Sequence, residues 1–186
     1  MNRITPIEPP YSPEVDAQLG RLMPDGVPPI ALFRTFVHNL PLTAAMEPWG
    51  GYELSSALSL SMRERELLID RTCALCSCEY EWGVHIAFFA ERVGLTHAQI
   101  TSLTHGDPSD ACWEHEPDAL LLQAADQLHR SSSIDDTTWT ALARHYDSAQ
   151  MLDIMFLCGW YHAISYAANA SGTPQEEGAP RFRDYR

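Results

Sequence analysis

Residues 64–95, ERELLIDRTCALCSCEYEWGVHIAFFAERVGL, decide the fold of this chain. Ser61 and Glu64 have the spacing of a capping box, which predicts that a helix opens there. A second helix is predicted from about residue 79 to residue 93, because Gly94 stands where helices commonly end. The residues expected to face inward from the first helix are Leu67, Leu68 and Thr72. The stretch therefore predicts two helices joined by a short turn that is rich in cysteine.

The sequence before this stretch is also predicted to be helical. A short helix is expected near Pro13–Leu22, and a second one begins near Ile30 and is expected to end at Pro41. A third is expected from about residue 42 to residue 52, with an interruption at Pro48 and at Gly50–Gly51.

The sequence after the stretch continues in the same way. Thr96 and Gln99 form another capping box, and Pro117 opens an amphipathic helix. SSSIDD is expected to cap a short helix, and Asp147 or Ser148 a long apolar helix that runs to about Ala170. Since no segment alternates as a strand does, the predicted fold class is all-α.

Composition divides the chain into three parts. Residues 1–29 form a proline-rich N-terminal arm, residues 30–172 a helical domain, and residues 173–186 a polar C-terminal tail. At 186 residues the chain is long enough for one domain with a sizeable core.

Charge narrows the range of partners. The chain has 12 Lys and Arg against 25 Asp and Glu, for a formal net charge of −13. Nucleic acids and anionic membranes require clustered positive charge, so neither is expected as a partner. The start of the sequence has no apolar signal-peptide core, which makes a cytoplasmic location the expectation. An odd number of cysteines, 5, is more typical of reduced or reactive thiols than of a disulfide scaffold.

Three chemically active side chains share one face of the second helix. Cys78, Glu81 and His85 are spaced i, i+3 and i+7, which places a thiol, a carboxylate and an imidazole together. The start of a helix favours a thiolate, whereas the nearby charges of Glu79 and Glu81 oppose it. From spacing alone the face is an acid–base site, a thiol redox site or a solvated ion pair.

A metal site is not expected here. Cys73, Cys76, Cys78 and His85 could supply four ligands, but a structural zinc site usually has a second, distant pair of ligands. Cys158 and His162, on the apolar helix, are expected to be core residues. No role is assigned to the remaining histidines that stand alone, which are His97, His105, His115, His129 and His145.

Residues 64–95 resemble the carboxymuconolactone decarboxylase family, which includes the alkylhydroperoxidase D-like proteins. The pattern is a glutamate in a first helix, a Tyr-Glu-Trp segment, a histidine four residues after the glutamate of that segment, and an apolar helix that ends in glycine. The likeness extends in the order of elements over about residues 40–170. The resemblance implies an all-α, alkylhydroperoxidase D-like helical bundle that assembles as a homo-oligomer, a trimer or a hexamer.

The hydroperoxidase members of that family use a glutamate, a Cys-x-x-Cys pair and a histidine. On this chain the glutamate matches Glu66 and the first cysteine matches Cys78, but the second cysteine is replaced by Glu81 and a relay histidine by Tyr80. A thiol-dependent, peroxiredoxin-type reaction would therefore need Cys76 or Cys73 as the partner of Cys78.

The decarboxylase members imply acid–base chemistry instead. The resemblance then assigns Glu66, Glu81 and His85 to proton transfer, with Cys78 beside them. Tyr80 and Trp82 are expected to line a substrate pocket or to pack. The chain carries about fifty N-terminal residues beyond the length of such decarboxylases, so the lactone itself is not assigned.

The leading expectation is a cofactor-independent lyase that decarboxylates or isomerises a small organic acid or lactone. The alternatives are the thiol-dependent hydroperoxidase and a non-catalytic helical oligomer.

Overall fold

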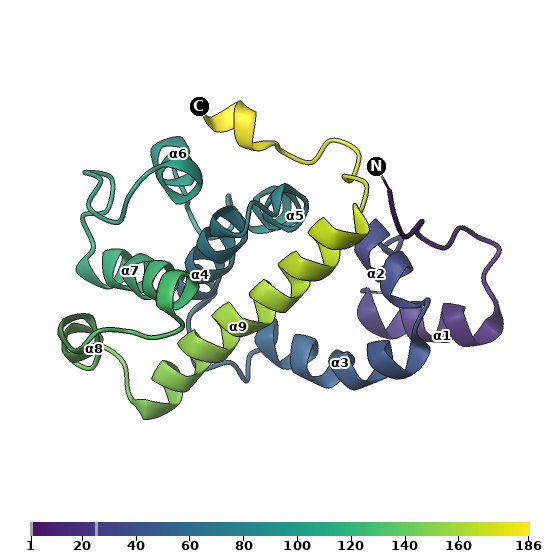
Figure 1. The fold of residues 1–186 in the computed structure, drawn as a ribbon, viewed down its shortest axis with the longest axis horizontal. Helices are drawn as coiled ribbons and strands as arrows, with labels where there is room; N and C mark the ends of the chain where they lie inside the picture. Colours follow the sequence, from purple (N-terminus) through teal and green to yellow (C-terminus); the bar gives the residue numbers. More distant parts are fainter. Residues whose placement is uncertain (1, 25) are drawn as a thin grey trace.

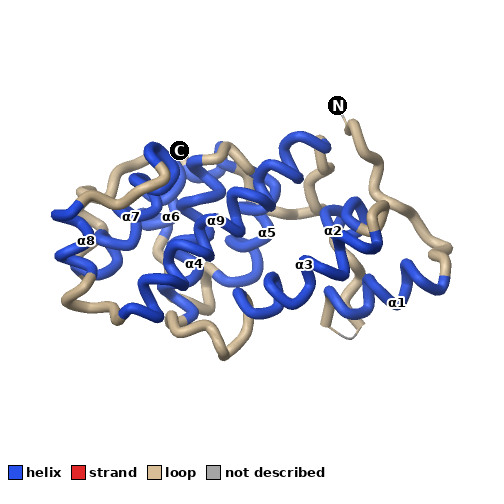
Figure 2. The backbone as a smooth tube through the Cα atoms, turned by 60° about the horizontal axis from the view of Figure 1, so that its bottom comes forward, coloured by secondary structure: helices blue, strands red, loops and turns tan. Residues whose placement is uncertain are grey.

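The computed structural model describes residues 2–24 and 26–186, and every regular element in those two ranges is helical, as the all-α prediction requires (Figure 2). The elements are α1 (Pro13–Leu22), α2 (Ala31–Phe36), α3 (Leu40–Glu53), α4 (Met62–Leu75), α5 (Glu79–Phe89), α6 (His97–His105), α7 (Glu116–Ser131), α8 (Asp136–Leu142), α9 (Ser148–Ser171) and the 3₁₀ helix η1 (Phe182–Tyr185). No helix among the described residues combines the length and the apolar character needed to cross a membrane.

Helix α4 lies at the centre of the main core. It packs against α5, α6, α7 and α9, and Figure 1 shows α9 running obliquely across the molecule beside it (Figure 1). The predicted inward residues Leu67, Leu68 and Thr72 are all fully buried. The long apolar helix expected near the C-terminus is α9, and Gly172 ends it with a φ of 68°. The central pair α4 and α5 therefore places most of residues 65–86 in the core, whereas residues 91–95 lie at or near the surface.

The turn between α4 and α5 is a Schellman motif. The N–H of Cys78 donates to the carbonyl of Cys73 at 2.8 Å, and the N–H of Ser77 donates to that of Ala74 at 2.9 Å. Ser77 adopts the left-handed conformation that this motif requires, with φ at 52°. Such a motif commonly brings the side chains of its two outer residues into contact, and those residues here are the buried Cys73 and Cys78.

Two predicted helix ends and one predicted interruption differ in the structure. The second helix stops at Phe36 rather than at Pro41, because Asn39 caps a new helix and Pro41 lies in its first turn. Pro48 and the two glycines do not interrupt that helix, which continues to Glu53. Helix α5 ends at Phe89, four residues before the predicted end.

Both ends of the chain pack on the domain. In the N-terminal arm, Val15 and Leu19 of α1 form a small core with Val37. The C-terminal tail folds back over α5, where the rings of Phe182 and Tyr185 pack edge-on against Trp82.

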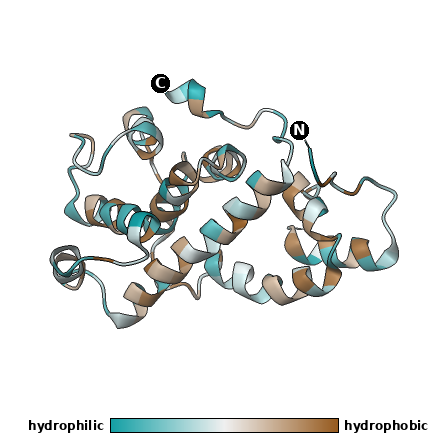
Figure 3. Cartoon of the chain, viewed as in Figure 1, coloured by the Kyte–Doolittle hydropathy of each residue, from teal (hydrophilic) through white to brown (hydrophobic). Residues whose placement is uncertain are grey.

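The outer side of α9 carries exposed apolar side chains. Figure 3 shows hydrophobic colour on several turns of this helix (Figure 3). Leu152, Phe156 and Tyr166 are 53%, 56% and 67% exposed.

Candidate acid–base site

Glu66 and His85 form a buried pair between α4 and α5. The Nδ1 of His85 lies 2.7 Å from Oε2 of Glu66. The other oxygen of Glu66 accepts a hydrogen bond from the Arg65 guanidinium at 2.7 Å. All three side chains are buried. Because Glu66 is held from both sides, it fixes the orientation of the imidazole.

The opposite nitrogen of His85 faces two further groups. Its Nε2 lies 3.1 Å from the hydroxyl of Tyr161, on α9, and 3.5 Å from Oε1 of Glu81. Oε2 of Glu81 is buried and has no hydrogen-bond partner among the described residues. The ring of Phe89 covers the imidazole at a centroid distance of 5.4 Å. The Glu81 carboxylate therefore has one oxygen that faces the imidazole and a second, buried oxygen that is unpaired among the described residues.

The two carboxylates control the charge of the histidine. Burial opposes protonation of the ring, but the charge and hydrogen bond of Glu66, and then those of Glu81, outweigh it and raise the pKa of His85 to about 10. At neutral pH the ring is therefore an imidazolium. In that form Nδ1–H donates to Glu66, and Nε2–H points toward Tyr161 and Glu81.

Asp70 is a further acid that the sequence analysis missed. It follows Glu66 by one helical turn and is 1% exposed. Burial, and then the charge of Glu66, raise the pKa of Asp70 well above its ordinary value. Its Oδ1 has no hydrogen-bond partner among the described residues. The i, i+4 spacing from Glu66 is the local signal that could have revealed Asp70. Arg65 and Tyr161 were missed as well, and no such spacing marks them in the sequence.

The two cysteines nearest this site are buried thiols. Burial raises the pKa of Cys78 to about 11, although the backbone N–H of Glu81 opposes the shift. Burial, followed by the charges of Cys78 and Glu81, raises the pKa of Cys73 well above its ordinary value. Both cysteines are free. The thiolate, which is the reactive form, is therefore disfavoured at neutral pH.

Tyr80 and Trp82 face the C-terminal tail. The Tyr80 hydroxyl donates to Glu176 at 2.5 Å and accepts from the N–H of Leu32 at 3.0 Å. Trp82 is fully buried against the tail. The structure thus shows packing for both residues, and their role in binding a substrate stays a prediction.

Cys76, which the sequence offers as a possible redox partner of Cys78, contacts α7. Its Sγ lies 3.8 Å from Nδ1 of His129, a residue to which the sequence analysis gave no role. Cys158, predicted to be in the core, is 2% exposed. His162, expected beside it in the core, is only partly buried and contacts His129.

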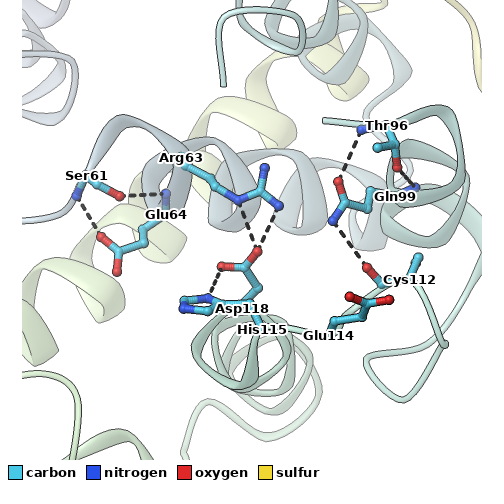
Figure 4. Close-up of a pocket in the computed structure, with 9 residues that line it drawn as sticks. All are labelled: Ser61, Arg63, Glu64, Thr96, Gln99, Cys112, Glu114, His115 and Asp118. Atoms are coloured by element: carbon cyan, nitrogen blue, oxygen red, sulfur yellow. Dashed lines mark hydrogen bonds and ion pairs between the residues drawn. The ribbon is translucent and has the colours of Figure 1, made fainter. Parts of the chain in front are cut away.

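An open surface hollow of about 630 Å³ lies elsewhere, at the start of α4 (Figure 4). Arg63 donates two hydrogen bonds to Asp118 across it, at 3.0 and 2.8 Å, and His115 lies 3.1 Å from the same carboxylate. These charges are already paired within the protein. The hollow contains none of the predicted site residues.

Solved structures support the fold. An uncharacterized peroxidase-related protein with an alkylhydroperoxidase AhpD core, from Ralstonia eutropha JMP134, superposes with a TM-score of 0.77 and 15% identity, covering 94% of this chain and 93% of that one. A variant of the debrominase Bmp8 in complex with 2,3,4-tribromopyrrole superposes with a TM-score of 0.75 and 14% identity. The superposition covers 98% of this chain and 94% of that one. An uncharacterized peroxidase-related protein from Silicibacter sp. TM1040 superposes with a TM-score of 0.74 and 18% identity, covering 97% of this chain and 96% of that one. No curated protein sequence matches the chain.

The family model that matches is described as the carboxymuconolactone decarboxylase family, and it covers residues 41–126. This segment includes α4 and α5 and hence Glu66, Glu81 and His85. The match and the AhpD-like fold confirm the resemblance seen in the sequence. Residues 41–126 of the chain are thus similar to the carboxymuconolactone decarboxylase family.

Proposed function

We propose that the protein is a cofactor-independent enzyme that performs acid–base chemistry on a small organic acid or lactone. The match to the family model and the AhpD-like neighbours, which include peroxidase-related proteins and a debrominase, support enzymatic activity in general. The observation that carries the acid–base assignment is the buried Glu81 carboxylate. Its Oε1 lies 3.5 Å from Nε2 of a protonated His85, and its Oε2 has no hydrogen-bond partner among the described residues.

Each group has a distinct role in this proposal. Glu81 is the base that removes a proton from the substrate, and His85 is the acid that delivers one from Nε2. In a decarboxylation, carbon dioxide leaves with its carbon–carbon bond broken, and the electron pair left on carbon takes the proton from the imidazolium. Glu66 positions His85 through Nδ1 and keeps the ring charged. Tyr161 holds Nε2 in place.

Burial of the thiols supports the same assignment. Cys78 is fully buried, and its raised pKa keeps it protonated at neutral pH. In this proposal it fills space next to Glu81 and takes no part in proton transfer.

A panel of small lactones and keto acids, with 4-carboxymuconolactone included, tests the assignment through release of carbon dioxide and changes in ultraviolet absorbance. Glu81→Gln and His85→Gln are expected to lower kcat at least a hundredfold on any substrate that turns over. Cys78→Ser is expected to keep kcat within a few-fold, and Glu91→Gln, an exposed glutamate outside the site, serves as the matched control. An equal loss in Cys78→Ser and Glu81→Gln would contradict the assigned roles.

A thiol-dependent hydroperoxide reductase is the second candidate, and one observation favours it. The Schellman turn joins Cys73 and Cys78, and both lie in the main core cluster, which favours Cys73 over Cys76 as the partner of Cys78. The reaction would convert a hydroperoxide and two thiols into an alcohol, water and a disulfide, which an external thiol would then reduce. Titration of the 5 thiols in denaturant before and after peroxide treatment decides the matter, since this candidate requires the loss of two together.

A homo-oligomer is part of the proposal. The exposed residues Leu152, Phe156 and Tyr166 give α9 an apolar outer side that a second copy of the chain could cover. Light scattering after size-exclusion chromatography measures the assembly. A non-catalytic oligomer, the third candidate, predicts assembly without turnover of any substrate in the panel.

A further inference from the structure

A second cluster of reactive side chains lies outside the acid–base site, where three helices meet. Cys76 caps the end of α4, His129 lies in the last turn of α7, and His162 lies on α9. The Sγ of Cys76, the Nδ1 of His129 and the Nε2 of His162 are all within 4.8 Å of one another. One sulfur and two imidazole nitrogens thus lie close enough together to share one metal ion.

The separations fit the coordination sphere of one zinc ion. Zinc–sulfur and zinc–nitrogen bonds of about 2.3 and 2.0 Å at tetrahedral angles place sulfur and nitrogen roughly 3.6 Å apart, and two nitrogens roughly 3.3 Å apart. The cluster has 3.8 Å between Cys76 Sγ and His129 Nδ1, and 2.9 Å between the two nitrogens. Small rotations of the two rings would therefore complete the geometry.

The hydrogen bonds behind the ligands hold them in position. Nδ1 of His162 lies 2.8 Å from the carbonyl of Cys158, so this nitrogen carries the proton and Nε2 keeps its lone pair. The side-chain amide of Asn169 donates to the carbonyl of Cys76 at 2.9 Å.

We propose that Cys76, His129 and His162 bind one zinc ion, with water in the fourth position. Thiolate and imidazole are the ligands that zinc prefers, and cobalt(II) takes the same geometry. Binding breaks the S–H bond of Cys76 and releases its proton to solvent as the sulfur–metal bond forms. His129 is exposed and the other two ligands are partly buried, so the open position faces water.

This ion would clamp the end of α4 to α7 and α9. Cys76 is two residues before Cys78, at the turn that leads into the acid–base helix. The metal would stabilise this turn and protect the Cys76 thiol from oxidation. The inference does not depend on the proposed function, since none of its ligands belongs to the Glu66–His85–Glu81 site.

Cobalt(II) titration of the full chain, reduced and then freed of metal with a chelator, tests the proposal. We expect one cobalt ion per chain, with a thiolate-to-cobalt charge-transfer band in the near ultraviolet and strong visible bands typical of tetrahedral cobalt. Zinc should displace cobalt and bleach both sets of bands. Zinc should also raise the melting temperature of the unmodified chain.

Substitutions assign the ligands. Cys76→Ser should abolish the charge-transfer band, and His129→Ala and His162→Ala should each weaken cobalt binding at least tenfold. Cys112→Ser and His145→Ala, which change a partly buried cysteine and a histidine outside the cluster, should bind as the unmodified chain does. His129→Gln is a conservative variant at an exposed position whose helical circular dichroism should match that of the unmodified chain.

Two results would overturn the proposal. One is the absence of a charge-transfer band at excess cobalt, which would leave His129 and His162 as a hydrogen-bonded pair. The other is a band that persists in Cys76→Ser, which would move the thiolate ligand to another cysteine.

Discussion

The Nδ1 of His85 lies 2.7 Å from Oε2 of Glu66, across the contact between α4 and α5, and both side chains are buried. This single contact couples the charge of the histidine to the packing of the two central helices. The other ring nitrogen of His85, Nε2, lies near Tyr161 and Glu81. The same pair therefore affects stability and the proposed chemistry, and the two effects can be measured separately.

Stability should fall at alkaline pH because of His85. Its pKa is about 10 in the folded protein against an ordinary value of 6.5, so the imidazolium stabilises the fold fully below about pH 6.5. The contribution of the imidazolium to the free energy of unfolding is lost as the pH rises from about 6.5 through about 10, by roughly 5 kcal/mol in total. Urea unfolding at both ends of this range measures the loss. His85→Gln should remove most of it, and an unchanged pH dependence in that variant would refute the assignment.

The thiols should react in the order of their exposure. Cys73 and Cys78 are fully buried, whereas Cys76 and Cys112 are partly exposed. Brief alkylation of the native protein, mapped by mass spectrometry, should label the latter two at least tenfold faster. Preferential labelling of Cys78 would instead indicate an accessible, activated thiol and would favour the hydroperoxidase candidate.

Ser77→Gly should stabilise the protein by about 1 kcal/mol, because a residue with a Cβ is strained in the left-handed conformation of the α4–α5 turn. The melting temperature should rise by about 2–4 °C. Ser77→Ala keeps the Cβ and should show no such gain. A rise of the same size in Ser77→Ala would show that backbone strain is not the cause.

Gly83→Ala should loosen the C-terminal tail. A Cβ at this position would lie 2.6 Å from the carbonyl oxygen of Pro180, closer than such atoms approach. We expect a loss of roughly 1–2 kcal/mol and faster hydrogen exchange in residues 173–186. Gly51→Ala is the control, since nothing lies within 4 Å of its Cβ, and it should stabilise α3 by about 0.5–1 kcal/mol. Unchanged exchange in Gly83→Ala would mean that the tail does not pack against α5 in solution.

The helices with local signals were predictable from the sequence. The capping boxes at Ser61 and Thr96 each open a helix as predicted, because a cap satisfies backbone groups only a few residues away. The long helix was predicted to be capped by Asp147 or Ser148, and the cap is Asp147. The end at Phe36 was predicted wrongly although its signal is local, since Asn39 caps the next helix and Pro41 lies in the first turn of that helix.

The site could be predicted only in part. Glu81 and His85 share a helix, so their spacing reveals them, and the family pattern adds Glu66. Tyr161 is 76 residues from His85 and joins it only through the packing of α9. His129 likewise meets Cys76 across 53 residues of sequence, a distance over which no spacing pattern applies.

The most direct test of the acid–base account is a titration of the His85 ring, followed by nuclear magnetic resonance of its nitrogen and carbon nuclei. The account predicts a pKa of about 10 in the unmodified chain, with the ring doubly protonated at neutral pH. Glu66→Gln should shift the pKa down by at least one unit, because it removes the charge that most strongly opposes the effect of burial. A pKa at or below 6.5 in the unmodified chain would show that His85 is neutral at physiological pH and would contradict its role as the acid.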